Sequence, residues 1–378
     1  MRILSLLVLS ALVVTLLAGG LRTAVSQDSI VQNLPAPTVT PAADGIFAAF
    51  QTHPLVGLGD QHGLAQEEDF YAALIRDKRF AANVGNVVVE FGDAAQQDTL
   101  DRYLAGEDVP YEPLRKVWSD TVGWIPTVVA LGYMNFYAQV RAVNEELPPK
   151  QRIHVWLGDP PIDWSKIQDK GDFFKILDKR NHYPADLINA QILAKKKKAL
   201  VIYGTFHFYG DKTLRGLVEL NHPGAFFLVT PYTGFIEKSC SDTFERGAQD
   251  WPRPALAAPV HDSTLKGLLS APRCHFLSAS AFGFPPSMTE AEKAKELADM
   301  EERSSGGAGN ALLYLGPAVT LTHSPFSPDL YLDADFRKEI DRRSFMTSGR
   351  HITWPSVRDN PTSPLYLHNY DNSVQGSK

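Results

Sequence analysis

Residues 55–63 of the chain, LVGLGDQHG, join a short apolar run to a polar exit. The run from Leu55 to Leu58 is too short for a helix, lacks strict alternation and is bounded by proline and glycine. These features are typical of a strand that is buried on both faces. Asp60 and His62 follow it directly. We therefore expect a strand of a parallel sheet whose carboxyl end carries an acid and a histidine.

Further apolar runs of the same character lie along the chain. They are residues 87–89, 153–157, 200–203, 226–229 and 311–316. Helical periodicity is found at residues 67–80, 127–147, 174–198 (which Pro184 can break) and 335–345. Strands that alternate with helices predict an α/β fold with a mostly parallel central sheet flanked by helices.

The chain changes character between the last two of these runs. Residues 231–307 are rich in proline and poor in strand patterns, apart from a charged helix predicted over 289–303. We expect a large insertion here, packed against the sheet before the last strand. The α/β domain is predicted to span residues 45–350, after a linker over 27–44 rich in Pro, Thr and Ala. A loosely ordered tail is expected over 351–378.

The first 26 residues predict export. Arg2 precedes an apolar run from Ile3 to Leu17, which is followed by Ala18-Gly19-Gly20 and, a few residues later, by the small-x-small exit Ala24-Val25-Ser26. This is the pattern of a secretory signal peptide, and the run of roughly 15 residues is short of the ~20 that span a bilayer. We expect cleavage near Ser26 and a periplasmic or secreted bacterial protein with no membrane span afterwards. An uncleaved N-terminal anchor is the alternative.

The net charge limits the classes of partner that the chain can bind, and the cysteine content predicts a disulfide. The net charge is −6 and no basic face emerges, which argues against nucleic acid as a partner. The basic run Lys195 to Lys198 falls at the end of a predicted helix, where a solvated terminus is more common than a binding patch. Cys240 and Cys274 are the two cysteines. In an oxidising compartment they predict one disulfide, with two buried free thiols as the alternative.

Acids and histidines follow four of the predicted strands. The residues at these carboxyl ends are Asp60, His62, Glu90, Asp159 and His207. Ligands of open α/β sheets bind at this edge, and these side chains bind metals or move protons near neutral pH. Asp159 precedes Pro160 and is well placed to cap a helix instead. Asp60 could also be a cap, and His207 could be a core histidine between two phenylalanines.

The order of these motifs resembles the superfamily of erythromycin esterases, ChaN and Tiki/TraB proteins. Residues 56–63, Glu67 and 88–90 resemble its opening, in which a Gly-Glu-x-His element follows the first strand and a glutamate the second. Residues 96–106 resemble a helix of the ChaN and esterase branches. Residues 180–186 are similar to the Arg-Asp-x-x-Met-Ala element of the esterases. The likeness covers roughly residues 50–210.

The resemblance implies an active site made of His62, Glu90, Arg180 and His207. Glu67 matches an active-site position of the family less closely. Asp60 stands where the family has a glutamate. The hypothesis is an exported hydrolase that acts on an ester or amide bond of a small molecule or peptide. His62 or His207 would activate water, Glu90 would orient this base, and Arg180 would stabilise the oxyanion.

Two other interpretations of these residues stay open. His62, His207 and an acid (Asp60 or Glu90) could instead hold a divalent metal ion that activates water. ChaN-type members bind haem, so the alternative function is a non-catalytic haem- or metal-binding protein. A scaffold that retains only the fold is a third reading.

Overall fold

Eight strands form one sheet in the order β1-β7-β8-β6-β2-β5-β3-β4. The structure is a computed structural model that describes residues 34–123, 130–235, 237–269, 274 and 309–352. The strands are β1 Thr38–Pro41, β2 Leu55–Asp60, β3 Asn86–Asp93, β4 His154–Asp159, β5 Ala199–Gly204, β6 Phe226–Pro231, β7 Ala255–Ala258 and β8 Ala311–Tyr314. Neighbours from β8 to β4 pair in parallel, and β7 pairs antiparallel with β8 and β1. The predicted α/β class with a mostly parallel sheet is confirmed.

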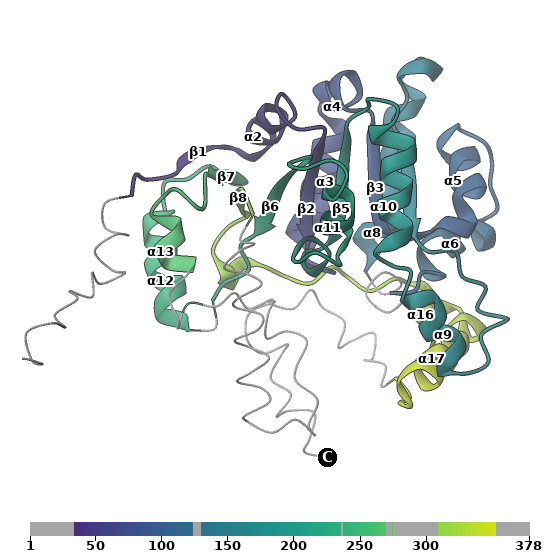
Figure 1. Ribbon diagram of the computed structural model, residues 1–378. Helices are drawn as coiled ribbons and strands as arrows, with labels where there is room; N and C mark the ends of the chain where they lie inside the picture. Colours follow the sequence, from purple (N-terminus) through teal and green to yellow (C-terminus); the bar gives the residue numbers. More distant parts are fainter. Residues whose placement is uncertain (1–33, 124–129, 236, 270–273, 275–308, 353–378) are drawn as a thin grey trace, which may run out of the picture.

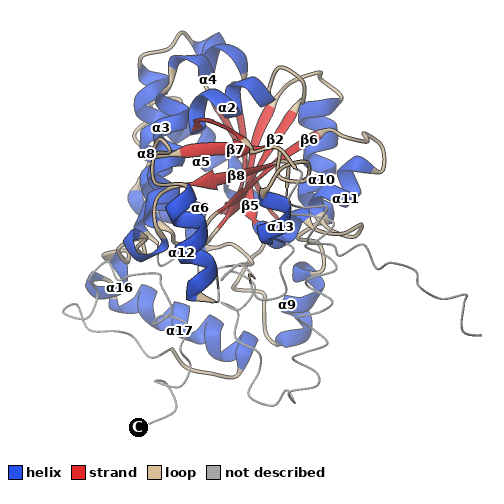
Figure 2. Ribbon diagram, turned by 90° about the vertical axis from the view of Figure 1, so that its left-hand side faces the viewer, coloured by secondary structure: helices blue, strands red, loops and turns tan. Residues whose placement is uncertain are grey.

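Helices cover both faces of the sheet, which explains why its central strands β2, β5 and β3 are buried along their whole length (Figures 1 and 2). One face carries α2 Ala42–Ala49, α3 Ala65–Arg76, α4 Lys78–Asn83, α5 Gln97–Leu104, α6 Tyr111–Ser119 and α8 Leu131–Glu145. The other carries α10 His182–Ile188 and α11 Leu214–Glu219. Val87 and Val89 pack on the first side and Val88 on the second. Burial on both sides removes the alternation that a one-sided strand would show.

The remaining helices lie toward the ends of the sheet. They are α9 Lys170–Leu177, α12 Lys238–Gly247, α13 Leu265–Leu269, α16 Asp329–Leu332 and α17 Ala334–Ser348. Figure 1 shows the chain leaving β8, passing along the carboxyl edge of the parallel strands and reaching α16 and α17. This path brings the C-terminal described segment next to the ends of β2, β5 and β3. No helix among the described residues is long and apolar enough to cross a membrane.

Two strands lie where none was expected. Thr38–Pro41, inside the predicted linker over 27–44, forms the edge strand β1, and Ala255–Ala258, inside the predicted insertion, forms β7. The linker prediction is therefore wrong for these residues, and the described part of 231–307 contributes a strand to the sheet besides packing against it. The predicted signal peptide, the helix over 289–303 and the tail beyond residue 352 lie outside the described residues.

The predicted helix over 174–198 is interrupted at a different place from the one expected. Helix α9 ends at Leu177 and α10 begins at His182, so the break falls before Pro184. Pro184 lies in the first turn of α10, where its missing N–H removes no helical hydrogen bond. The consequence is functional, because residues 178–181 become a loop and Arg180 lies in it rather than on a helix.

Cys240 and Cys274 form a disulfide, with their Cα atoms 5.6 Å apart. The bond lies among the buried side chains that pack α12 against β7 and β8, including Phe244 and Tyr314. The predicted pairing is confirmed. The alternative of two free thiols is wrong.

Candidate active site

Five ionisable side chains meet at the carboxyl edge of the sheet, and we call them the Glu90 cluster. They are Asp60, His62, Glu90, Arg180 and His207. Three adjacent strands position them, because β2, β5 and β3 are consecutive in the sheet. Asp60 ends β2, Glu90 belongs to β3, and His207 lies in a short 3-10 turn, Thr205–Phe208, directly after β5. The carboxyl edge is where ligands of such sheets bind.

Glu90 is the common partner of the cluster. Its Oε1 atom accepts a hydrogen bond from Arg180 Nη2 and lies 3.2 Å from His207 Nε2. Its Oε2 atom accepts from the backbone N–H of Gly204 at 2.6 Å and lies 3.8 Å from His62 Nε2. Burial alone would raise the pKa of this carboxyl, but His207, His62 and Arg180 outweigh it and hold the pKa well below its usual value. Glu90 is therefore a buried carboxylate at neutral pH.

Gly204 allows this close approach. A Cβ atom on this residue would lie 3.0 Å from His62 Nε2 and 3.2 Å from Glu90 Oε2. Either side chain would have to move to make room for it. The glycine that ends β5 thus lets both catalytic candidates lie against the strand end, and it supplies an N–H to Glu90.

His62 is held between two acids. Its Nδ1 atom lies 2.7 Å from Asp60 Oδ2, and its Nε2 atom faces Glu90. Asp60 is buried and also accepts hydrogen bonds from Tyr71 at 2.8 Å and Tyr133 at 2.5 Å. It therefore orients the imidazole and does not cap helix α3, which has no side-chain cap.

The two acids set the protonation state of His62. Burial lowers the pKa of the imidazole, but Glu90 and the hydrogen bond and charge of Asp60 outweigh burial and raise this pKa to about 9. His62 is thus an imidazolium at neutral pH. This differs from the expectation that the resting histidine is ready to accept a proton from water.

Asn181 fixes the orientation of His207. Its Oδ1 atom lies 2.6 Å from His207 Nδ1 and also accepts the backbone N–H of Leu214 at 3.1 Å. An amide oxygen only accepts hydrogen bonds, so His207 Nδ1 carries the proton of this contact. The other ring nitrogen, Nε2, faces Glu90. His207 is buried but is not a core histidine in an apolar setting, because both of its ring nitrogens face oxygen atoms.

Arg180 lies between two buried carboxyl groups. Glu90 and Asp159 raise the pKa of the guanidinium, although burial opposes them. Asp159 accepts a hydrogen bond from the backbone N–H of Val122, and no helix begins at Pro160. The prediction that Asp159 caps a helix is therefore wrong. Burial raises the pKa of Asp159 well above its usual value, whereas the pKa of Glu90 is held well below its own, so Glu90 is the stronger acid of this pair.

Glu67 lies beneath the loop that carries His62. It is buried, and its Oε2 atom accepts the backbone N–H of Gln61 at 2.9 Å. Burial, and then the charge of Asp60, raise its pKa well above the usual value. Burial therefore favours the protonated form of Glu67, which supports the loop through this hydrogen bond. Its hydrogen bond goes to the backbone of Gln61, so Glu67 supports the loop from outside the Glu90 cluster.

The segment after β8 lies beside the loop that carries His62. Leu64 and His323 form an antiparallel bridge, and Ser324 N donates to Gly63 O at 2.7 Å. Burial raises the pKa of the neighbouring Glu68 to about 8, while a hydrogen bond with Ser324 opposes this. The loop is thus held from both sides, which keeps the imidazole of His62 at Asp60 and Glu90.

The structure brings together all four predicted catalytic residues, His62, Glu90, Arg180 and His207, and Asp60 with them. Their catalytic roles stay a prediction. Sequence reasoning missed the groups that orient them, namely Asn181, Tyr71, Tyr133 and Gly204. Asn181 stands at the acidic position of the Arg-Asp-x-x-Met-Ala element that the loop resembles, and that match was the available signal for it. The two tyrosines are on helices and carry no motif.

The arrangement of the Glu90 cluster does not fit a divalent metal ion. Among residues 34–352, where described, no group of three or more His, Cys, Asp or Glu side chains is arranged to hold a metal. Both ring nitrogens of His62 face acids, and those of His207 face Asn181 and Glu90. Arg180 already bonds to the carboxylate that a cation would need. A metal ion could bind Glu90 only if this carboxylate left its present partners.

Comparisons with known proteins give a distant likeness in fold. No family model and no curated protein matches the chain. Similar solved structures include a Bacillus cereus protein, at 9% identity over 77% of this chain and 97% of that one with a TM-score of 0.41. A succinoglycan biosynthesis protein has 12% identity, coverage of 55% and 76% and a TM-score of 0.38. ChaN of Campylobacter jejuni, whose structure describes cofacial heme binding, has 12% identity, coverage of 51% and 87% and a TM-score of 0.34.

These values are too low to carry an argument about activity. The superfamily that the sequence resembles therefore stays a prediction for this chain. The geometry of the Glu90 cluster has to carry any functional conclusion by itself.

Proposed function

We propose that this chain hydrolyses an ester or amide bond at the Glu90 cluster. The observation that carries the proposal is the convergence of His62, His207 and Arg180 on one buried carboxylate. This places proton donors and a proton acceptor within reach of one another. Positioned groups of this kind and fixed positive charges are the two main resources of carbonyl hydrolysis.

The protonation states assign the roles. His62 is an imidazolium, so it acts as the general acid that protonates the leaving oxygen or nitrogen. Arg180, which carries a fixed positive charge, binds the carbonyl oxygen and stabilises the negative charge that develops on it. Glu90 is ionised and accepts a proton from the attacking water. The role of base thus passes from the histidines, where the sequence suggested it, to Glu90.

The protons balance over one turnover. The oxygen of water bonds to the carbonyl carbon, one proton of this water moves to Glu90, and the bond to the leaving group breaks as that group takes the proton of His62. Glu90 then returns its proton to His62 across the Oε2 to Nε2 pair, which is 3.8 Å apart. This last transfer is downhill because the pKa of His62 is far above that of Glu90.

We also propose that the enzyme works outside the cytoplasm on a small molecule or peptide. The signal-like sequence of residues 1–26 supports export. The disulfide between Cys240 and Cys274 supports an oxidising compartment.

Turnover of a panel of nitrophenyl esters and peptide anilides at pH 7 tests the proposal. We expect the purified chain to hydrolyse members of the panel and His62→Gln to lose turnover by about 10²-fold or more, because the general acid is gone. His154→Gln is the matched control. His154 lies at the amino end of β4, and the Glu90 cluster lies at the carboxyl ends of the strands. It should keep full turnover.

The alternative function has its own result. Haemin titration and metal analysis of the same samples report on a carrier. A chain that turns over no panel member and shows a haemin-dependent Soret band that His62→Gln removes would contradict the hydrolase and favour the carrier.

A further inference from the structure

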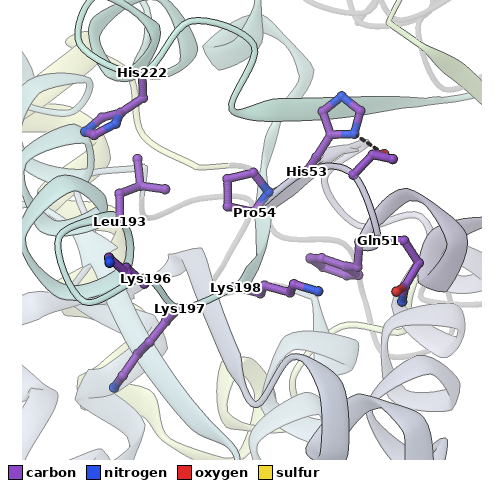
Figure 3. Close-up of a pocket in the computed structure, with 10 residues that line it drawn as sticks. Gln51, His53, Pro54, Leu193, Lys196, Lys197, Lys198 and His222 are labelled. Carbon is purple, nitrogen blue, oxygen red and sulfur yellow. Dashed lines mark hydrogen bonds between the residues drawn. The ribbon is translucent and has the colours of Figure 1, made fainter.

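A pocket of about 410 Å³ lies at the amino ends of the parallel strands, opposite the carboxyl ends that carry the Glu90 cluster (Figure 3). Residues 50–54, 193, 196–198 and 222 line it. They belong to the loops that enter β2, β5 and β6 at their amino ends. These three strands are adjacent, in the order β6-β2-β5, so loops far apart in sequence meet at one place.

The lining of the pocket is positively charged. Lys196, Lys197 and Lys198 contribute three ammonium groups, and His53 and His222 contribute two imidazoles. No acidic residue lines it. In the described part of the chain these three lysines form no ion pair and no side-chain hydrogen bond. This concentration of cations is unexpected in a chain whose net charge is −6.

Lys195 behaves differently from the residues that follow it. Its Nζ atom donates to Gln191 Oε1 at 2.5 Å, and it does not line the pocket. Lys196 adopts a left-handed backbone conformation with φ of 52°, which turns the chain sharply before β5. Asn86 Nδ2 donates to Lys198 O at 3.1 Å and anchors this turn to β3. Lys195, Lys196 and Lys197 are exposed to solvent, as expected for this run, and Lys198 is half-buried in the pocket lining.

The pocket also has an apolar part. Phe50, Pro54 and Leu193 line it together with the cations. Figure 3 shows Pro54 in the middle of the lining, with Leu193, Lys196 and His222 on one side and His53 on the other. Lys198 extends toward the side of Gln51. A ligand that fits must therefore offer a negative group and an apolar group at the same time.

We infer that this pocket binds a phosphate monoester that carries an apolar or aromatic group. Unpaired lysine ammonium groups bind phosphate as point charges, and hydrogen bonds between ionised groups are the strong ones. The apolar residues account for the second half of the ligand. The site is independent of the Glu90 cluster, because it lies at the amino ends of the same strands.

Calorimetric titration of the purified chain with phenyl phosphate and with inorganic phosphate tests this inference. We expect saturable binding of phenyl phosphate, tighter than that of inorganic phosphate. The double variant Lys196→Gln with Lys198→Gln should weaken binding by about tenfold or more, the loss expected when charge-assisted contacts are removed.

Lys195→Gln is the matched control, because it removes the same charge from the same run without touching the pocket. It should change the affinity by less than about twofold. No saturable binding, or an equal loss in the control and in the double variant, would overturn the inference. Vesicles of phosphatidylglycerol distinguish a lipid headgroup, because binding to vesicles without binding of soluble phenyl phosphate would contradict a small-molecule site. The rate of hydrolysis at the Glu90 cluster should be the same in the parent chain, in the double variant and in Lys195→Gln.

Discussion

Glu90→Gln is expected to lower turnover of any ester or amide substrate by about 10²–10⁴-fold, the range for loss of a positioned proton acceptor. The amide oxygen can keep the hydrogen bond from Gly204 N, so the strand end stays supported. It cannot accept a proton from water, and it removes the negative charge that holds Arg180 and His207 together. Steady-state kinetics on the best substrate of the panel measures the effect, and circular dichroism checks the fold.

Glu219→Gln is the matched control for this change. Glu219 also accepts an arginine N–H, from Arg215 at 2.8 Å, and a backbone N–H, from Phe226 at 3.2 Å. It lies on α11, outside the cluster. We expect its turnover to stay within about twofold of the parent chain. Equal rates for the two variants would show that Glu90 is a structural ion-pair partner and would refute its role as base.

The second large effect is on stability against pH. The pKa of His62 is raised to about 9 in the folded chain, from an ordinary value of 6.5. A group whose folded pKa is raised stabilises the fold fully below its unfolded pKa and loses this contribution as the pH rises through the folded value. His62 therefore contributes about 3 kcal/mol to the free energy of unfolding below pH 6.5, which is lost between about pH 6.5 and 9.

Urea unfolding of the parent chain and of His62→Gln across this range measures the contribution. Asp93, with a pKa raised to about 7, and Glu68, with a pKa raised to about 8, also lower stability as the pH rises. The informative quantity is therefore the difference between parent and variant, which should shrink from pH 6.5 to pH 9. His351→Gln is the control, because its ion pair with Asp341 is exposed. A difference that does not change with pH would mean that His62 is neutral in the fold.

The central sheet could be predicted because burial on both faces leaves a clear pattern. Val87, Val88 and Val89 carry it, and each such run became a parallel strand. Strand β7 could not be found in this way. Its sequence, Ala-Leu-Ala-Ala, has no β-branched residue and lies between prolines, so its pairing with β1 and β8 makes it a strand.

The candidate site was predictable where the backbone alone positions it. Asp60 ends β2 and Glu90 directly follows the regularly paired residues Val87–Val89 of β3, and parallel strands bring their carboxyl ends to one edge. The partners supplied by helices and loops were not predictable. Tyr133 reaches Asp60 from helix α8, and Asn181 reaches His207 because α9 ends earlier than its periodicity suggests.

The protonation of His62 was the main feature beyond sequence reasoning. The sequence around His62, Gly59-Asp60-Gln61-His62-Gly63, gives no indication of the pKa of this histidine. The pKa depends on the distances from His62 to Asp60 and Glu90, which the packing of the fold sets. These distances reverse its role from base to acid. The mechanism proposed for the cluster depends on this reversal.

Imidazole NMR of the ¹⁵N-labelled chain from pH 5 to 10 tests the central claim most directly. His62→Gln assigns the resonance, and Glu90→Gln shows how much of the shift Glu90 supplies. We predict that His62 titrates with a pKa of about 9, and that the value falls in Glu90→Gln because the carboxylate is lost. A pKa at or below 6.5 in the parent chain would contradict the account, since His62 would then not be the proton donor of the cluster.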